Sequence, residues 1–262
     1  MALVEREDRG AVAHLTLNAP ERLNALSDAM LAALQESFDA LAGESAVRAI
    51  TLGGRGKAFC AGHDLKEMTA GRSENDGGAA YFADLFGRCS KLMLTIPELP
   101  QPVIARVHGI ATAAGCQLVA SCDMAVAAES CRFGVNGVNI GLFCSTPMVA
   151  LSRNVARKQA FEMLVTGKFV EAARALELGL VNRVVQDDAL EESCRELAET
   201  VAEKLGSAVR IGKRAFYEQI QMPLDAAYAH VGEVMVENML DGDTAEGISA
   251  FLEKRRPEWA RQ

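Results

Sequence analysis

Two stretches of the chain combine small residues with an expected helix start, and each could bind an oxygen atom through the main chain. Residues 58–68 read AFCAGHDLKEM and residues 111–123 read ATAAGCQLVASCD. N–H groups at the start of a helix lack intrahelical partners and carry the positive end of the helix dipole. Small side chains let a ligand oxygen approach these groups. Two such stretches side by side would offer two donors to one oxygen, which is an oxyanion hole.

Strands and helices must position these stretches. VEREDRGAVAHLTLN alternates like a hairpin that turns at Gly10, and Ser27 is expected to cap a helix that ends at Gly43. VRAITLGG and PVIARVHG each predict a strand that leads into one of the two stretches. Strands that alternate with helices predict βαβ crossovers and a largely parallel sheet, so the two stretches would follow neighbouring strands.

The pattern changes after about residue 190, where ALEESCRELAETVAEKL begins a series of amphipathic helical segments. We predict that Asp243 caps the last helix, with Glu246 three residues further on as its capping-box partner. The sequence therefore divides into a core at 1–190 and a helical region at 191–262.

Composition excludes several classes of protein. The net charge of −8 argues against the basic face of a nucleic-acid-binding protein. The seven cysteines contain no CxxC pair and the four histidines show no metal-ligand spacing, so we predict no metal site. No apolar run approaches the roughly 20 residues of a membrane span. MALVERED lacks an apolar core of signal length, and we expect a cytoplasmic protein.

The two stretches resemble the signature segments of the crotonase (enoyl-CoA hydratase/isomerase) superfamily. ERLNAL at 21–26, TGKFVEAARALELGLVNRVV at 166–185 and EGISAFLEKRRPEW at 246–259 resemble further segments, so the likeness covers nearly the whole chain. ATAAGCQLVASCD and GVNxGLFCSTP are similar to runs of one subgroup. The resemblance implies an α/β crotonase (ClpP-like) spiral of ββα repeats, a C-terminal helical trimerisation region, and a homotrimer or dimer of trimers. It also implies a coenzyme A thioester as substrate and no separate cofactor.

The resemblance further implies which residues act. The oxyanion donors would be the main-chain N–H groups of His63 and Ala114, and the His63 imidazole could also face the acyl pocket. Phe251 and Lys254 match an aromatic residue and a cation of the last helix that meet the CoA nucleotide, often from a neighbouring subunit. The positions that match the family's CoA-lining residues are Arg22, Leu23, Ala25, Ala61, His63, Asp64, Leu65 and Lys66.

Both acids of the family's hydratases are missing. One glutamate of the family would lie in the helix after the second oxyanion stretch, where Gln117 stands. The other would lie four residues after the Phe of F-G-x-x-E, but the segment here reads FGVNG and ends at Gly137. An amide cannot take up a proton near neutral pH. Because each positioned acid or base contributes about 10²–10⁴-fold, losing both should cripple hydration.

Other groups could replace the acids. Cys144 and Ser145 fall on the loop that lines the water site in hydratases, and Cys144 is either a nucleophile or, as we favour, a buried small hydrophobe. Asn136 and Asn139 flank the second site but are amides. Asp123 and Glu129 are interpreted as structural or surface residues, and Glu67 is interpreted as facing solvent.

The sequence therefore predicts an acyl-CoA-binding enzyme, nominally an enoyl-CoA hydratase or isomerase. Its predicted catalytic positions are His63, Ala114, Gln117, Gly137 and Ser145. Two alternatives stay open. One is a non-catalytic or regulatory acyl-CoA binder, and the other is a different crotonase reaction such as decarboxylation or thioester hydrolysis.

Overall fold

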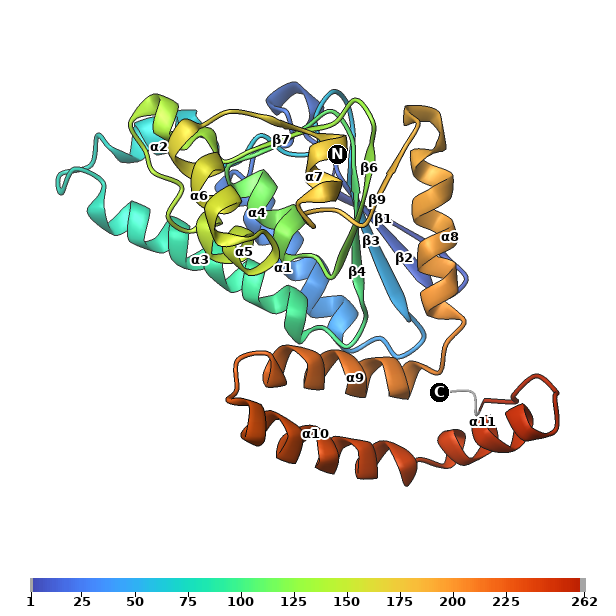
Figure 1. Cartoon of the computed structure of the whole chain (residues 1–262). Coiled ribbons are helices and arrows are strands. Elements are labelled where there is room, and N and C mark those ends of the chain that lie inside the picture. The colour runs from blue at the N-terminus through green and yellow to red at the C-terminus, as the bar shows by residue number, and fades with distance from the viewer. Residues whose placement is uncertain (1, 260–262) are drawn as a thin grey trace.

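A computed structural model describes residues 2–259, which form a six-stranded sheet between layers of helices, with a helical region below it (Figure 1). The large sheet has the order β1-β2-β3-β4-β6-β9, and a second sheet has the order β5-β7-β8. Among the strands of residues 2–259, only the pairs β1–β2 and β7–β8 are antiparallel. The predicted α/β class with a largely parallel sheet is thus confirmed.

The strands are β1 (Val4–Arg9), β2 (Val12–Leu17), β3 (Ala49–Gly54), β4 (Val103–Val107), β5 (Ile110–Thr112), β6 (Met124–Ala128), β7 (Arg132–Gly134), β8 (Val170–Glu171) and β9 (Arg183–Val185). The α-helices are α1 (Asp28–Ala42), α2 (Leu65–Gly71), α3 (Ala79–Glu98), α4 (Ala114–Ser121), α5 (Pro147–Asn154), α6 (Arg157–Thr166), α7 (Ala172–Glu177), α8 (Leu190–Ala202), α9 (Gly206–Gln219), α10 (Leu224–Met239) and α11 (Gly242–Leu252). The 3-10 helices are η1 (Pro20–Arg22), η2 (Asn136–Ile140) and η3 (Asp187–Ala189).

Helix α1 forms where the sequence predicted it. The Ser27 hydroxyl accepts a hydrogen bond from the Met30 N–H at 3.2 Å, and the helix closes at Gly43. Its buried side chains include Met30, Leu34, Phe38 and Leu41, which recur every three or four residues and therefore face the sheet.

Helix α8 covers the other face of the large sheet. Its buried residues Leu190, Cys194, Ala198 and Ala202 are spaced four apart and pack against side chains of β2, β3, β4 and β6. Figure 1 shows α8 on the side of the sheet opposite α1, α3 and α4. The central strands β3, β4 and β6 are therefore buried on both faces, as expected for parallel strands, whereas the edge strand β1 is largely exposed.

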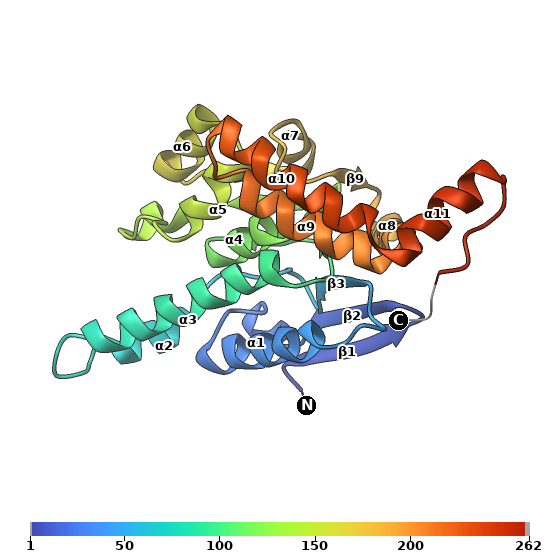
Figure 2. The same cartoon turned by 90° about the horizontal axis from the view of Figure 1, so that it is seen from below.

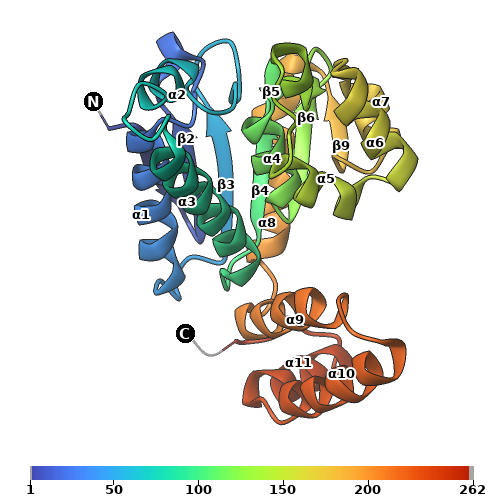
Figure 3. The same cartoon turned by 90° about the vertical axis from the view of Figure 1, so that its left-hand side faces the viewer.

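Helices α9 to α11 lie below the sheet (Figure 3), and α9 and α10 run side by side (Figure 2). Lys213 of α9 anchors this region, because its ammonium group donates to Ile96 O, Gln101 O and the Asp123 carboxylate at 2.8–2.9 Å. Tyr217 donates to the same carboxylate at 2.8 Å.

The predicted cap of the last helix is wrong by two residues. Asp241, not Asp243, is the N-cap of α11, and its carboxylate accepts from the Asp243 N–H at 2.8 Å. Asp241 has Thr244 three residues further on and so lacks a capping-box partner, but its carboxylate alone caps the helix, which begins two residues before the predicted start.

Candidate active site

The first small-residue stretch connects β3 to α2. Asp64 is the N-cap of α2 and accepts hydrogen bonds from the N–H groups of Lys66 at 2.9 Å and Glu67 at 3.2 Å. Its carboxylate also pairs with Arg22. Burial works to raise the pKa of Asp64, but the two amide hydrogen bonds and the guanidinium together hold that pKa below its usual range. Asp64 is therefore ionised at neutral pH and fixes the end of this loop.

The second stretch runs from β5 into α4, and its turn is unusual. Ala113 precedes the helix with φ 50° and ψ −121°, and Ala114 is the first residue of α4. The Ala113 N–H donates to Gly134 O at 2.8 Å. The end of strand β7 thus fixes the turn through this hydrogen bond.

The two stretches lie against each other. Cys60 N–H donates to Ile110 O at 3.2 Å, and Thr112 N–H donates to Cys60 O at 3.1 Å. A β-carbon placed on Gly62 would lie 2.9 Å from the Ala113 β-carbon and 3.3 Å from the Ala114 nitrogen. Only a residue without a side chain fits at position 62, which explains the glycine in AFCAGHDLKEM.

Two main-chain donors in these stretches are unpaired. Within residues 2–259, neither the N–H of His63 nor that of Ala114 hydrogen-bonds to another group of the chain. The first follows Gly62 directly, and Gly62 lies against the nitrogen of the second. The fold thus brings the two predicted oxyanion donors onto adjoining segments.

The His63 side chain is mostly enclosed. Its Nδ1 lies 3.4 Å from Leu26 O, and its ring meets the Phe86 ring edge-on with centroids 5.7 Å apart. Its Nε2 is buried and has no partner among the described residues. Burial lowers the pKa of His63, although the contact with Leu26 O opposes this shift. The imidazole is therefore neutral at pH 7.

Gln117 lies in the first turn of α4 and is 4% exposed. Its main-chain N–H donates to Ala113 O at 3.0 Å, which begins the helix. The side-chain Oε1 is buried and has no partner among the described residues. A buried amide oxygen without a partner is costly, so this group is available to a ligand or a water molecule.

Gly137 is closed off by its own loop. Leu142 N–H donates to Gly137 O at 3.0 Å, and the Gly137 N–H lies 3.4 Å from the Cys144 sulfur. A β-carbon on Gly137 would collide with Leu142 O and lie 2.9 Å from Cys144 Sγ. The position of the second family glutamate therefore has no room for a side chain.

Of the polar residues near Gly137, Cys144, Asn136 and Asn139 have structural roles, and Ser145 lies at the surface. Cys144 is buried, and burial raises the pKa of its thiol, so it stays protonated at neutral pH. Asn136 accepts from the Thr112 hydroxyl at 2.6 Å, and Asn139 donates to Gly167 O at 3.1 Å. Ser145 is exposed, with its hydroxyl 3.4 Å from Phe143 O.

The ERLNAL segment flanks the first loop. Ala61 N–H donates to Leu23 O at 3.0 Å, while Ala25 is buried and Leu23 is 43% exposed. Asn24, which the sequence analysis did not single out, is fully buried and donates to Ala58 O at 2.8 Å. The one sequence signal for this structural role is that Asn24 stands before two apolar residues, in N-A-L.

The rim of this segment is partly exposed. Leu65 and Lys66 are exposed at the start of α2. Glu67 was interpreted as facing solvent, and this is wrong. Its carboxylate accepts from the Asp28 N–H at 2.8 Å and pairs with Arg22, because α2 folds onto the start of α1.

Phe251 and Lys254 lie away from these loops within one chain, at the far end of the helical region (Figure 1). Phe251 is 82% exposed, and Lys254 follows the end of α11 with φ 56°. Asp123 is structural, as interpreted, because it holds Lys213 and Tyr217. Glu129 is exposed and accepts from Gln186 at 2.6 Å.

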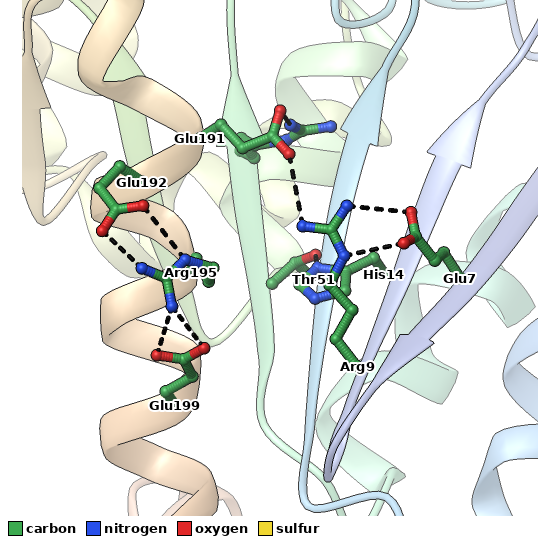
Figure 4. A network of polar contacts seen from close by, with 9 residues as sticks. Glu7, Arg9, His14, Thr51, Glu191, Glu192, Arg195 and Glu199 are labelled. Atoms are coloured by element: carbon green, nitrogen blue, oxygen red, sulfur yellow. Dashed lines mark hydrogen bonds and ion pairs between the residues drawn. The ribbon is translucent and has the colours of Figure 1, made fainter.

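A polar hollow of about 350 Å³ lies elsewhere, between α8 and strands β1 to β3 (Figure 4). Arg9 pairs there with Glu7 at 2.8 Å, and Arg195 pairs with Glu192. Both arginines are thus paired with carboxylates at the surface of the hollow. It contains none of the predicted site residues.

The comparison with known families decides what the chain is. The profile described as enoyl-CoA hydratase/isomerase matches residues 7–262. The chain belongs to the enoyl-CoA hydratase/isomerase family. This confirms the crotonase resemblance that the two signature segments carried.

Several relatives of this family match over nearly the whole chain. Human enoyl-CoA hydratase domain-containing protein 3, mitochondrial, is 44% identical over 96% of this chain and 81% of that protein. A Mycobacterium smegmatis enoyl-CoA hydratase structure matches with TM-score 0.94, 57% identity and 98% of both chains covered. The crystal structure of human enoyl-CoA hydratase domain-containing protein 3 matches with TM-score 0.94 at 43% identity, covering 98% of this chain and all of that one. The similarity to one subgroup that ATAAGCQLVASCD and GVNxGLFCSTP indicated is thus confirmed, and it is the subgroup of enoyl-CoA hydratase domain-containing protein 3.

The prediction of a cytoplasmic protein is wrong. The relatives that are 42–45% identical to this chain are named as mitochondrial proteins. The expectation rested on the lack of an apolar signal core in MALVERED, and this feature could not decide the compartment, because mitochondrial targeting segments are amphipathic rather than apolar. Among the described residues, no helix has the length and apolar character to cross a membrane.

Proposed function

We propose that this family member binds acyl-CoA thioesters and holds the thioester oxygen between the N–H groups of His63 and Ala114. The observation that carries the proposal is the pair of unpaired donors on adjoining loops. An enolate that develops on the bound acyl group would place negative charge on this oxygen. Each such donor contributes about 3 kcal/mol of transition-state stabilisation.

The chemistry would follow from the groups around this oxygen. Gln117 can hydrogen-bond a substrate or water but cannot accept a proton, and Gly137 has no side chain. Hydration of enoyl-CoA by a pair of acids would therefore be slow. The closed loop at Gly137 favours a second candidate, a reaction that needs a polarised thioester without that pair, such as decarboxylation or thioester hydrolysis. A non-catalytic binder would use the same donors.

The CoA moiety would lie along the segment that flanks the first loop. Leu23, Leu65 and Lys66 are exposed there, and Arg22 is held beside them by Asp64. These groups combine apolar surface with two cations, which suits a ligand with an adenine ring and phosphates. No cofactor beyond the thioester is needed for this role.

The helical region would join copies of the chain into a homotrimer or a dimer of trimers. Support comes from the apolar side chains it exposes, because monomers rarely expose so many together. On α10 and α11 and at the residue after α10 these are Leu224, Tyr228, Met235, Val236, Met239, Leu240, Ile248, Phe251 and Leu252. In such an assembly, Phe251 and Lys254 would reach the CoA of a neighbouring copy.

The carbonyl contact can be tested by comparing two ligands that differ only at that atom. Acetyl-CoA and S-ethyl-CoA share the CoA moiety, but the thioether has no carbonyl oxygen. Two hydrogen bonds of about 0.5–1.5 kcal/mol each predict that acetyl-CoA binds about 5- to 150-fold more tightly in calorimetry. Equal affinities would contradict the proposal, and so would failure of these two ligands and of longer acyl-CoA esters to bind.

Turnover is measured separately with crotonyl-CoA, malonyl-type esters and β-hydroxyacyl esters, followed by mass. Hydration of crotonyl-CoA no faster than with heat-treated protein is expected. Release of carbon dioxide or free CoA from one of the other esters would identify the reaction. Tight binding of these esters without formation of any product would support the alternative of a non-catalytic acyl-CoA binder.

A further inference from the structure

Ala113 adopts a backbone conformation that residues with a β-carbon avoid. Its φ of 50° with ψ −121° lies on the side of conformational space where the β-carbon crowds the neighbouring peptide groups. A glycine would adopt these angles freely. Strained residues persist only where their surroundings force the conformation, and they cluster at functional sites.

Three hydrogen bonds force this conformation. Ala113 N–H donates to Gly134 O at 2.8 Å, and the preceding Thr112 N–H donates to Cys60 O at 3.1 Å. On the other side, Ala113 O accepts from the Gln117 N–H at 3.0 Å as the first bond of α4. The turn is therefore tied to strand β7, to the first loop and to the helix.

The Ala113 methyl group lies at the junction of the two loops. The β-carbon that a residue at 62 would have falls 2.9 Å from it, so the methyl group occupies the space beside the Gly62 α-carbon. Gly62 directly precedes His63, and Ala113 directly precedes Ala114. The Ala113 methyl group thus contacts Gly62, and each of these two residues directly precedes a residue with an unpaired N–H donor.

We propose that Ala113 is a positioning residue of the oxyanion hole. Its methyl group, held in a strained backbone conformation, fixes the distance between the two loops and so the position of the His63 and Ala114 donors. The inference rests on the proposed function of those donors. It assigns a role to alanine where glycine would be easier for the backbone. Glycine would relieve the strain but would leave the loops free to shift relative to each other.

The test uses acetoacetyl-CoA, whose enolate has its own ultraviolet absorption band. The acidic α-carbon lets the ligand ionise without a catalytic base, so the band per bound ligand reports the donors alone. Ala113→Gly removes the methyl group, and Ala113→Ser keeps a β-carbon at the same place. Ala198→Gly is the control for the loss of a methyl group elsewhere: Ala113 is partly buried, whereas Ala198 is fully buried and faces the sheet from α8.

In Ala113→Gly we expect an enolate band at least three-fold weaker per bound ligand, together with a Tm equal to or above that of the unmodified protein. Ala113→Ser should restore most of the band, while Ala198→Gly should lower the Tm and keep the band. An unchanged band in Ala113→Gly would overturn the inference, and so would its unfolding, since relieving strain should not destabilise the turn. If the unmodified protein binds the ligand without any enolate band, the proposed oxyanion hole itself fails, which separates the two outcomes.

Discussion

Restoring the second family glutamate at Gly137 should damage the protein rather than repair a hydratase. The collision begins at the β-carbon, which would meet Leu142 O and Cys144 Sγ, so Gly137→Ala already carries most of the effect. To make room, the loop must give up the hydrogen bond between Leu142 N–H and Gly137 O, 3.0 Å long.

The magnitude follows from these two terms. Overpacking a tight site costs about 1–3 kcal/mol, and a lost buried hydrogen bond costs about 1 kcal/mol more. A total of about 3 kcal/mol lowers the Tm of a chain of this size by about 6–12 °C. Gly87→Ala is the control, because Gly87 lies exposed within α3 with open space around its α-carbon. That variant should gain stability by about 0.5–1 kcal/mol.

The assay is hydration of crotonyl-CoA alongside thermal unfolding. Gln117→Glu alone should raise the hydration rate by about 10²-fold, the lower end for one positioned group. Adding Gly137→Glu should lower the rate again, because the loop is displaced. A double variant that is faster than the single one, or a Gly137→Ala variant as stable as the unmodified protein, would refute this account of the closed loop.

Three further predictions concern the framework around the site. Lys213→Met should cost about 3–5 kcal/mol in urea unfolding, because it leaves the nearly buried Asp123 carboxylate without its cation, whereas Tyr217→Phe should cost only about 1 kcal/mol. Burial lowers the pKa of His63 below its ordinary value of 6.5, so protonation favours the unfolded chain and stability should fall as the pH drops below about 6.5. His63→Gln should make the fall of the urea midpoint with pH shallower over this range, and the remaining slope comes in part from His14 and His108, whose pKa values burial also lowers. Asn24→Ala should cost about 2–3 kcal/mol in urea unfolding and weaken acetyl-CoA binding in calorimetry, because its buried side chain ties the flanking segment to the first loop.

Local sequence patterns determined a large part of the fold. The alternation in VEREDRGAVAHLTLN produced the β1–β2 hairpin, and the serine before a helical period produced the start of α1. The small residues before α2 and α4 marked both loops of the candidate site. Such features depend on periods of two or about 3.6 residues and on capping side chains, which act within a few positions of each other.

Tertiary contacts decided what those patterns could not. Glu67 contacts the start of α1, and Gly137 is closed by Leu142 and Cys144, although nothing in the FGVNG segment indicates this collision. The strain at Ala113 comes from bonds to β7 and to the first loop, both distant in the sequence. The sequence by itself thus determined the class of fold and the two loops that carry the donors. Only the packing of segments far apart in the chain decided how the loops meet and whether a second acid has room, because excluded volume depends on which atoms become neighbours.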